Sequence, residues 1–256
     1  MESIQLNTKT DERTSFQSPQ KLKFATYTKR FLFLMAAIMA AMMTFTACLE
    51  DDNEGGENGN GGGVAGKRLK YYIVSSPGTV DIKTEYTYNS DGTDKRNDVT
   101  QGGKLILYEL YTSNPDGLLA KHEQYMPDMP GYKNVWEYTY DSNKKMKKRD
   151  GVMYMDGKIT GTSTVDYTFQ NGRKIKEVVT DNYGGGSQVM ILEYSYDSKG
   201  KRTITNQTIN GVPSQSTRIY NSDGTLQKVT HSSGSVYTFT WENGKSISDF
   251  DDHAQF

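Results

Sequence analysis

The chain holds few residues whose types and spacing could support catalysis or bind a metal. Its three histidines, His122, His231 and His253, stand far apart, so no HxxH or HExxH pair offers zinc a site. Nucleophile-elbow, P-loop and dinucleotide-binding glycine motifs are absent as well. We therefore expect no enzymatic activity, no catalytic residues, no metal and no cofactor.

Carboxylates give two weaker chemical hypotheses. Asp91 and Asp223 lie in Asn-Ser-Asp-Gly segments and could contact calcium, but the EF-hand spacing is missing, which favours plain turns. A hydrolase would need two acids about 5–10 Å apart in a cleft, such as Glu137 and Glu193 on units expected to lie side by side. Glutamates there serve equally as cross-strand partners of lysine. A secreted hydrolase is therefore the least favoured function.

The one cysteine is the residue with the clearest chemistry. Lys29 and Arg30 precede an uncharged run over residues 31–45, which is typical of a secretory signal peptide. The run is shorter than the ~20 residues of a membrane-spanning helix, but the uncharged window can be extended to Leu49, so a single transmembrane anchor is the alternative. Residues 45–48, Phe-Thr-Ala-Cys, resemble a lipobox, and this resemblance implies lipidation of Cys48. We predict a signal peptide over residues 1–47 and a membrane anchor through the lipid.

The residues after Cys48 predict where the protein is displayed. Glu50, Asp51 and Asp52 form an acidic run, and a Gly- and Asn-rich segment continues to residue 66. This composition is typical of flexible coil, so residues 48–66 are expected to be a tether. An acidic run directly after a lipidated cysteine resembles the export signal of surface lipoproteins in the Bacteroides group. The resemblance implies a cell-surface position on the outer membrane; the alternatives are a periplasmic position and a merely solubilising tether.

Composition excludes nucleic acid as a partner but not a folded domain. The formal net charge of the 256 residues is -1, so no overall field attracts nucleic acid. The chain contains 18 tyrosines, which a disordered polypeptide of low hydrophobicity would lack. Residues 67–256 are therefore expected to fold.

Residues 67–256 contain a degenerate repeat. Each copy has an aromatic residue, any residue, a second aromatic residue and a turn that usually ends in glycine. Aromatic residues alternate with Thr, Glu and Asp, which is the period of a β-strand, and the turn should join two strands of a hairpin. Where Lys144 replaces the glycine, we expect slight strain or the use of Asn143 instead. The second aromatic positions are Tyr88, Tyr111, Tyr140, Phe169, Tyr196, Tyr220 and Trp241.

Seven such units predict about fourteen short antiparallel strands in an all-β meander. So large a sheet must curl or close to hide its edges. A closed barrel of that size would have an interior too wide for side chains to fill, and a membrane barrel would need aliphatic residues on its lipid face. We therefore predict a soluble curled sheet or an incomplete, porin-like barrel, with a longer loop at the proline-rich residues 126–131.

The unit resembles the YD (RHS-type) repeat, in which Tyr-Asp is followed by a short turn and glycine. Tyr140-Asp141 and Tyr196-Asp197 match it literally. Long arrays of such repeats wind into shells around cargo, but seven units are too few to enclose a protein. The order of leader, tether and repeats is also similar to Bacteroides-group lipoproteins of unknown function with a porin-like β fold. That resemblance implies an architecture and no active residues.

The aromatic ladder is the one feature of the repeat domain that could bind a ligand. Flat amphipathic rings stack on sugar rings or extended partners, whereas the alternative is a core for a sheet that is poor in aliphatic residues. We predict a surface lipoprotein with a non-catalytic binding or scaffold domain that takes a protein or glycan ligand, and a dedicated glycan-binding module is the first alternative. The platform candidates are Trp136, Tyr138, Tyr140, Phe169, Tyr194, Tyr196, Tyr220, Tyr237, Phe239 and Trp241.

Overall fold

The structure is a computed structural model that describes residues 66–184 and 186–244. Within these ranges the chain is all-β, as predicted, and β5 and β6 are joined by the longer loop at residues 126–131. The strands are β1 (Lys67–Ser75), β2 (Ile82–Tyr88), β3 (Asp94–Gln101), β4 (Lys104–Ser113), β5 (Leu119–Tyr125), β6 (Tyr132–Tyr140), β7 (Met146–Met155), β8 (Lys158–Gln170), β9 (Arg173–Tyr183), β10 (Gly186–Tyr196), β11 (Arg202–Ile209), β12 (Val212–Tyr220), β13 (Leu226–His231) and β14 (Val236–Asn243).

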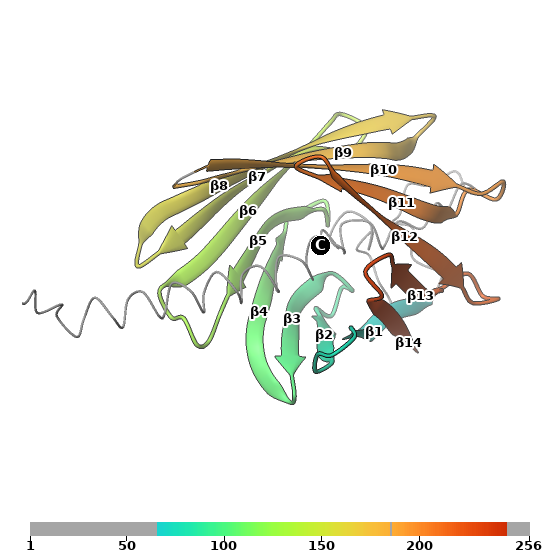
Figure 1. Ribbon diagram of the computed structural model, residues 1–256, viewed down its shortest axis with the longest axis horizontal. Helices are drawn as coiled ribbons and strands as arrows, with labels where there is room; N and C mark the ends of the chain where they lie inside the picture. The colour runs from blue at the N-terminus through green and yellow to red at the C-terminus, as the bar shows by residue number, and fades with distance from the viewer. Residues whose placement is uncertain (1–65, 185, 245–256) are drawn as a thin grey trace, which may run out of the picture. The chain divides into compact units, whose positions relative to one another are not determined.

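The sheet closes into a barrel, so the prediction of a curled sheet or incomplete barrel is wrong. Every strand pairs antiparallel with its neighbours in the chain, and β14 pairs with β1 along the whole length of β1 (Figure 1). Closure hydrogen-bonds both edges that an open sheet would leave exposed. The expectation that a closed barrel of this size is too wide for side chains to fill is also wrong. Long side chains line the interior, and the largest fully buried ones include those of Arg202, Tyr132 and Tyr237.

A β-bulge recurs at the same place in all seven odd-numbered strands. Opposite the end of each even-numbered strand, the odd strand has a first buried position, and its second buried position comes three residues later. A bulge increases local twist, so seven copies coil the sheet evenly and favour its closure. The first and second buried positions are Leu69 and Tyr72, Asp94 and Asn97, Leu119 and His122, Met146 and Arg149, Lys174 and Glu177, Arg202 and Thr205, and Leu226 and Val229.

The seventh repeat unit is divided between the two ends of the barrel. The other six units each consist of an even strand, a turn and the following odd strand. In the seventh, β14 supplies the aromatic strand and β1 supplies its partner, with Trp241 opposite Leu69 in register. The amide of Gly244 donates to the carbonyl of Gly66 at 3.1 Å, so the first and last residues of the barrel-forming segment are in contact.

Turns of one geometry join the strands within most units. In the turns at residues 89–93, 114–118, 141–145, 197–201 and 221–225, the fourth amide donates to the first carbonyl and the first amide donates to the fifth carbonyl. The fourth residue needs a positive φ, which is 95° at Gly92. Lys144 adopts φ 63° itself, so the strained alternative is found and Asn143 does not replace the glycine.

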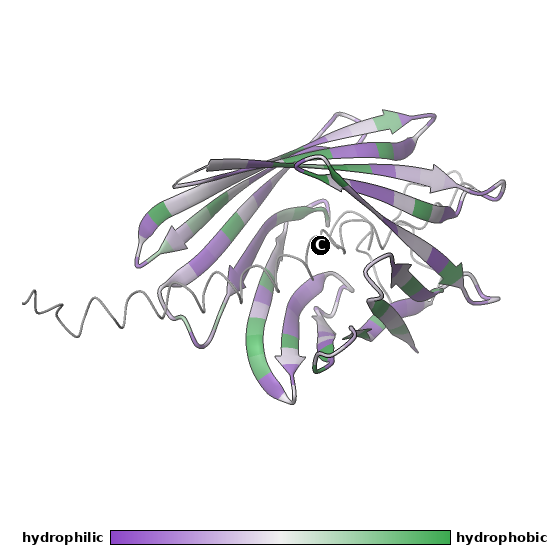
Figure 2. Ribbon diagram, in the orientation of Figure 1, coloured by the Kyte–Doolittle hydropathy of each residue, from purple (hydrophilic) through white to green (hydrophobic). Residues whose placement is uncertain are grey.

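The outer wall of the barrel carries charged and hydroxyl side chains. Ion pairs run along individual strands, for example Lys83–Glu85 at 3.0 Å and Arg96–Asp98 at 2.7 Å. Hydrophobic and hydrophilic residues alternate along the strands (Figure 2). A lipid-facing wall needs an apolar residue at every second position, and the outward residues do not supply such a band. Exposed large hydrophobic side chains among the described residues are Val80, Ile159, Phe169, Val189, Val212 and Ile219.

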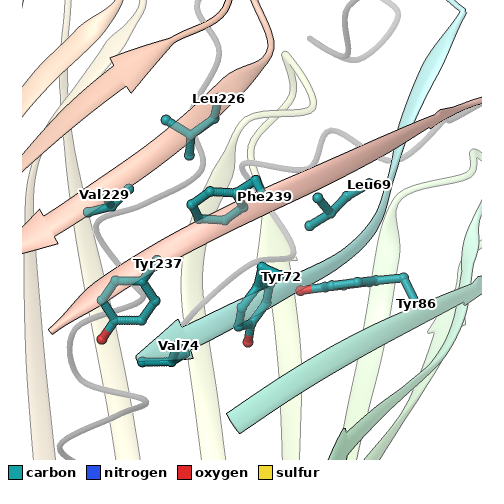
Figure 3. Close-up of a cluster of buried hydrophobic side chains, with 8 residues drawn as sticks. All are labelled: Leu69, Tyr72, Val74, Tyr86, Leu226, Val229, Tyr237 and Phe239. Atoms are coloured by element: carbon teal, nitrogen blue, oxygen red, sulfur yellow. The ribbon is translucent and has the colours of Figure 1, made fainter. Parts of the chain in front are cut away.

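Buried hydrophobic side chains gather in clusters drawn from neighbouring strands. One cluster joins β13, β14, β1 and β2 (Figure 3), and three of its eight buried residues are tyrosines. The ring centroid of Tyr72 lies 6.1 Å from that of Tyr86 and 5.7 Å from that of Phe239. Tyrosine thus provides much of the buried area that aliphatic residues provide in other barrels.

Candidate functional site in the barrel interior

The aromatic ladder faces the interior of the barrel. The rings of the buried members are covered by other side chains, so they present no flat face at the surface. The buried platform candidates are Tyr138, Tyr194, Tyr237 and Phe239; the half-buried ones are Trp136, Tyr140, Tyr196, Tyr220 and Trp241; and Phe169 is exposed.

The second aromatic residue of most units fastens its strand to the preceding odd strand. In each case a side-chain donor reaches the carbonyl of the first buried position, so the polar tips of the ladder serve the fold. Phe169 carries no donor, and it is the exposed member of the set. The bonds run from Tyr88 to Leu69, Tyr140 to Leu119, Tyr196 to Lys174, Tyr220 to Arg202 and Trp241 to Leu226.

His122 lies between two aromatic rings. Its ring centroid is 4.8 Å from that of Tyr111 and 4.7 Å from that of Trp136, with interplanar angles of 7° and 19°. The three residues face one another in register on β4, β5 and β6. The next position of this row, on β7, is Gly151, where an added Cβ would come within 2.7 Å of the indole of Trp136. Gly151 therefore makes room for the stacked indole.

Glu109 is the fully buried anion beside this stack. Tyr111 Oη donates to its carboxylate at 2.7 Å and Gln124 Nε2 donates at 3.0 Å, while His122 Nε2 lies 3.3 Å away. Burial raises the pKa of the Glu109 carboxyl, but His122, Tyr111 and Gln124 together hold that pKa below its ordinary value. The carboxylate is therefore ionised at neutral pH and held by partners from its own and the neighbouring strand.

Four cationic side chains are buried in the part of the barrel formed by β7–β12, and the sequence patterns singled out none of them. Lys174 Nζ lies 2.7 Å from Glu177 Oε1. Glu177 is the one buried carboxylate on these strands, and the half-buried Asp181 adds a second on β9. Four cations therefore face two carboxylates. The four cations are Arg149, Lys174, Arg202 and Arg218.

Aromatic faces compensate part of this excess of positive charge. The guanidinium carbon of Arg202 lies 3.9 Å from the ring centroid of Tyr194, and Lys174 Nζ lies 5.8 Å from the same ring. The guanidinium of Arg149 lies 6.0 Å from the Trp136 ring. A cation over a ring face is stabilised by about 0.5–2 kcal/mol. That range is smaller than the cost of several kcal/mol for burying an ion.

Arg218 has no such partner among the described residues. Its side chain is 7% exposed, and none of its three guanidinium nitrogens has a hydrogen-bond partner. Burial raises the pKa of the Tyr194 hydroxyl well above its ordinary value, and Glu177 raises that pKa further, whereas Arg218 opposes the rise. Arg218 is therefore within electrostatic reach of Tyr194, the residue whose ring also contacts Arg202.

Aligning the units by their bulges would have revealed these cations. In this alignment Tyr111 takes the first aromatic position of its unit and Ser113 the second, which corrects the placing of Tyr111 from the sequence. The first position then holds an aromatic residue in six units and Arg218 in the remaining one. The first buried position holds Leu or Met in four units and a charged residue in the other three, two of which are Lys174 and Arg202. The alternation of residues alone hid them, because a charged residue in a strand is expected to face outward.

The acids considered from the sequence lie far from one another or in turns. Glu137 on β6 and Glu193 on β10 are both exposed and have three strands between them, which is about 19 Å along a sheet. They do not form the close pair that a glycoside hydrolase needs. Asp91 and Asp223 accept hydrogen bonds from the backbone and hydroxyl of Thr93 and Thr225, as turn residues do. In residues 66–184 and 186–244, no three His, Cys, Asp or Glu side chains converge on a metal position.

The predicted lipidation and export residues lie outside the described residues. These are Cys48, Glu50, Asp51 and Asp52, together with the signal peptide at residues 1–47 and nearly all of the tether at 48–66. Across the part of the chain that the structure describes, no helix is long and apolar enough to cross a membrane.

Comparison with known proteins gives matches among solved structures. No protein-family model and no curated protein matches the sequence. The chain is similar to a porin-like protein from Bacteroides vulgatus, with a TM-score of 0.48 and 9% sequence identity over 68% of this chain and 98% of that chain. It is also similar to a porin-like protein from Bacteroides uniformis, with a TM-score of 0.43 and 12% identity over 69% of this chain and 97% of that chain.

Proposed function

We propose that this chain is a surface lipoprotein of the outer membrane whose barrel is a non-catalytic binding or scaffold domain. The observation that carries the proposal is that the barrel-forming segment of the chain begins and ends at the same end of the barrel. β1 begins and β14 ends side by side, at the end of the barrel where the unit turns also lie. A lipidated segment before Gly66 would hold the barrel by this end and leave the outer wall and the opposite end open to a partner.

The wall and the interior support the same proposal. Ion pairs such as Lys83–Glu85 suit a wall that stands in water beside the membrane. Inside, Glu109 is held by its hydrogen-bond partners rather than presented to a substrate. The glycan-binding alternative has less support, since four of its ten platform candidates are buried.

Lipidation is tested by the Cys48→Ala variant in cells fed a radiolabelled or alkyne-tagged fatty acid. We expect the wild-type chain to carry label and to sediment with membranes, and the variant to lose both. The matched control is Ser75→Ala, a conservative change at the end of β1, which should keep the label. Label on Cys48→Ala equal to that on the wild type would refute the anchor.

Surface display is tested by adding protease to intact cells. The wild-type barrel should be cleaved or should bind an antibody without cell lysis, whereas a variant with Glu50, Asp51 and Asp52 changed to alanine should stay protected while still carrying lipid. Changing Glu57 alone, in the same predicted tether, should leave display intact. Protection of the wild-type barrel in intact cells would place it on the periplasmic side.

A further inference from the structure

We infer that the interior of the barrel contains an anion-binding site, formed by Arg218 together with Arg202 and Lys174. Its ligand is an oxyanion group, such as a phosphate, a sulfate or a carboxylate. The inference deepens the binding part of the proposed function. It is independent of lipidation and display, because it concerns charges inside the folded barrel.

The balance of charge is the first argument. On β7–β12, four buried cations face the buried Glu177 and the half-buried Asp181. Lys174 is paired with Glu177 at 2.7 Å. Burial lowers the pKa of the Arg149 guanidinium, whereas Tyr167 and Tyr138, followed by Glu177 and Asp181, raise it above its ordinary value. Arg202 lies over the ring of Tyr194, and among the described residues the guanidinium of Arg218 contacts neither a carboxylate nor a ring face.

The convergence of these cations is the second argument. Arg202 lies 3.9 Å and Lys174 lies 5.8 Å from the ring of Tyr194. Tyr194 pairs with Thr205 and Thr205 pairs with Ser216, which puts Arg218 two strands from Tyr194 and one inward position farther along. Tyr194 is itself buried, so the three cations lie in a region of low solvent exposure. Guanidinium groups present planar pairs of N–H donors that fit the oxygens of phosphate and carboxylate. The guanidinium nitrogens of Arg218 carry five N–H donors, and none of these nitrogens has a hydrogen-bond partner among the described residues.

The position of Arg218 in the repeat is the third argument. The other units place Tyr or Phe at this position, and those side chains fill the interior without charge. A hydrophobic residue at such a site would stabilise the fold as well as an arginine or better. Arg218 also lies one inward position from Tyr220, next to the turn at residues 221–225.

The test uses the full chain, purified in mild detergent, and its Arg218→Phe variant, which places the residue of β14 in β12. Binding of radiolabelled inorganic phosphate is measured by equilibrium dialysis, and thermal unfolding is followed in phosphate, sulfate or acetate against chloride at equal ionic strength. Arg96→Gln is the matched control, because Arg96 is half-exposed on the outer wall and paired with Asp98. Phosphate and sulfate stabilise proteins generally, so the difference between variants is what counts.

We expect the wild type and Arg96→Gln to bind one anion per chain and to unfold at a higher temperature in at least one of the three oxyanions. Arg218→Phe should bind that anion about tenfold more weakly or worse and lose the specific rise. In chloride alone the variant should be at least as stable as the wild type. An oxyanion response equal in all three proteins, or absent from the wild type, would overturn the site while leaving the Cys48 and shaving results unaffected. Loss of stability of Arg218→Phe in chloride would show a purely structural role and would overturn it too.

Discussion

At the scale of single residues, the interior depends on a side chain that is missing. An alanine at Gly151 would bring its Cβ within 2.7 Å of the Trp136 indole and 3.1 Å of Ser163 Cβ. We expect Gly151→Ala to destabilise the barrel by about 1–3 kcal/mol, because overpacking moves the indole away from His122. Urea unfolding followed by tryptophan fluorescence measures this loss. Gly186→Ala on β10, where an added Cβ meets nothing within 4 Å, is the control; equal effects of the two changes would contradict the clash.

The depressed pKa of Glu109 predicts a loss of stability in acid. A carboxyl whose pKa is lower in the folded chain stabilises the fold above its unfolded pKa, and that stability is lost as pH falls through the folded pKa. We therefore expect the free energy of unfolding to fall below the ordinary glutamate pKa of 4.5. Chemical unfolding between pH 7 and pH 3 measures the slope. Glu109→Gln should lower stability at pH 7 and flatten the slope; an unchanged slope would assign the acid lability to other carboxyl groups.

Residue types alone could not reveal which charged groups lie inside. Lys174, Arg202 and Arg218 are of the same residue types as the lysines and arginines of the outer wall. Only their positions in the strands place them inside the barrel. The bulge shifts the inward phase by one residue within each odd strand, which affects Lys174 and Arg202, whereas Arg218 lies on the even strand β12 and keeps the phase of Tyr220. Strict alternation therefore assigns the wrong face to every residue beyond the bulge.

At the scale of strands and turns, the sequence patterns were informative because the signals are local. Alternation of aromatic and polar residues marked the even strands, and Asn/Asp with glycine marked their turns. The fourth residue of each turn was located correctly even at Lys144, where the choice between strain and Asn143 depended on backbone geometry. The link from each second aromatic to a carbonyl of the preceding odd strand was not expected. It joins residues 15–22 positions apart in the chain.

These links predict that the hydroxyl groups stabilise the strands. Tyr220→Phe removes the donor to the Arg202 carbonyl at 2.8 Å and should cost about 1–2 kcal/mol, because the carbonyl is left without that partner. Tyr71→Phe is the control, since Tyr71 lies on the outer wall over Lys83 and no hydrogen bond of its hydroxyl is found in the described chain. Thermal unfolding of both variants measures the difference. Similar melting temperatures would mean that the ring alone holds the strand.

At the scale of the whole barrel, closure was the feature that composition could not predict. The expected width of the interior argued against a closed barrel. Closure is favoured instead because it hydrogen-bonds the two edge strands and because seven equal bulges increase the twist of the sheet. The interior also contains charged side chains at positions where most repeat units have Tyr, Phe, Leu or Met. Both properties depend on how all fourteen strands are placed together, so neither is visible in any one unit.

The divided seventh unit predicts that the chain can be circularly permuted without loss of the barrel. Joining Gly244 to Gly66 by a short turn and opening the chain between Asn221 and Gly224 should give a permuted barrel, because the joined ends are already hydrogen-bonded at 3.1 Å. Circular dichroism and cooperative unfolding would check its fold. Opening the chain instead inside β9, in the middle of a paired strand, should prevent folding. A permuted chain that remains unfolded would show that the order of the strands matters beyond their final pairing.

The divided unit also determines when the barrel can close during synthesis of the chain. β1 finds its second neighbour only in β14, the last strand of the barrel to leave the ribosome. Until then every growing intermediate has two unpaired edges, and each edge is a template for another copy of the same repeat. The contact that closes the barrel is also the one of greatest separation in sequence, so it is expected to form late in folding. Completion of the barrel and protection of its edges from aggregation thus depend on the same strand, β14.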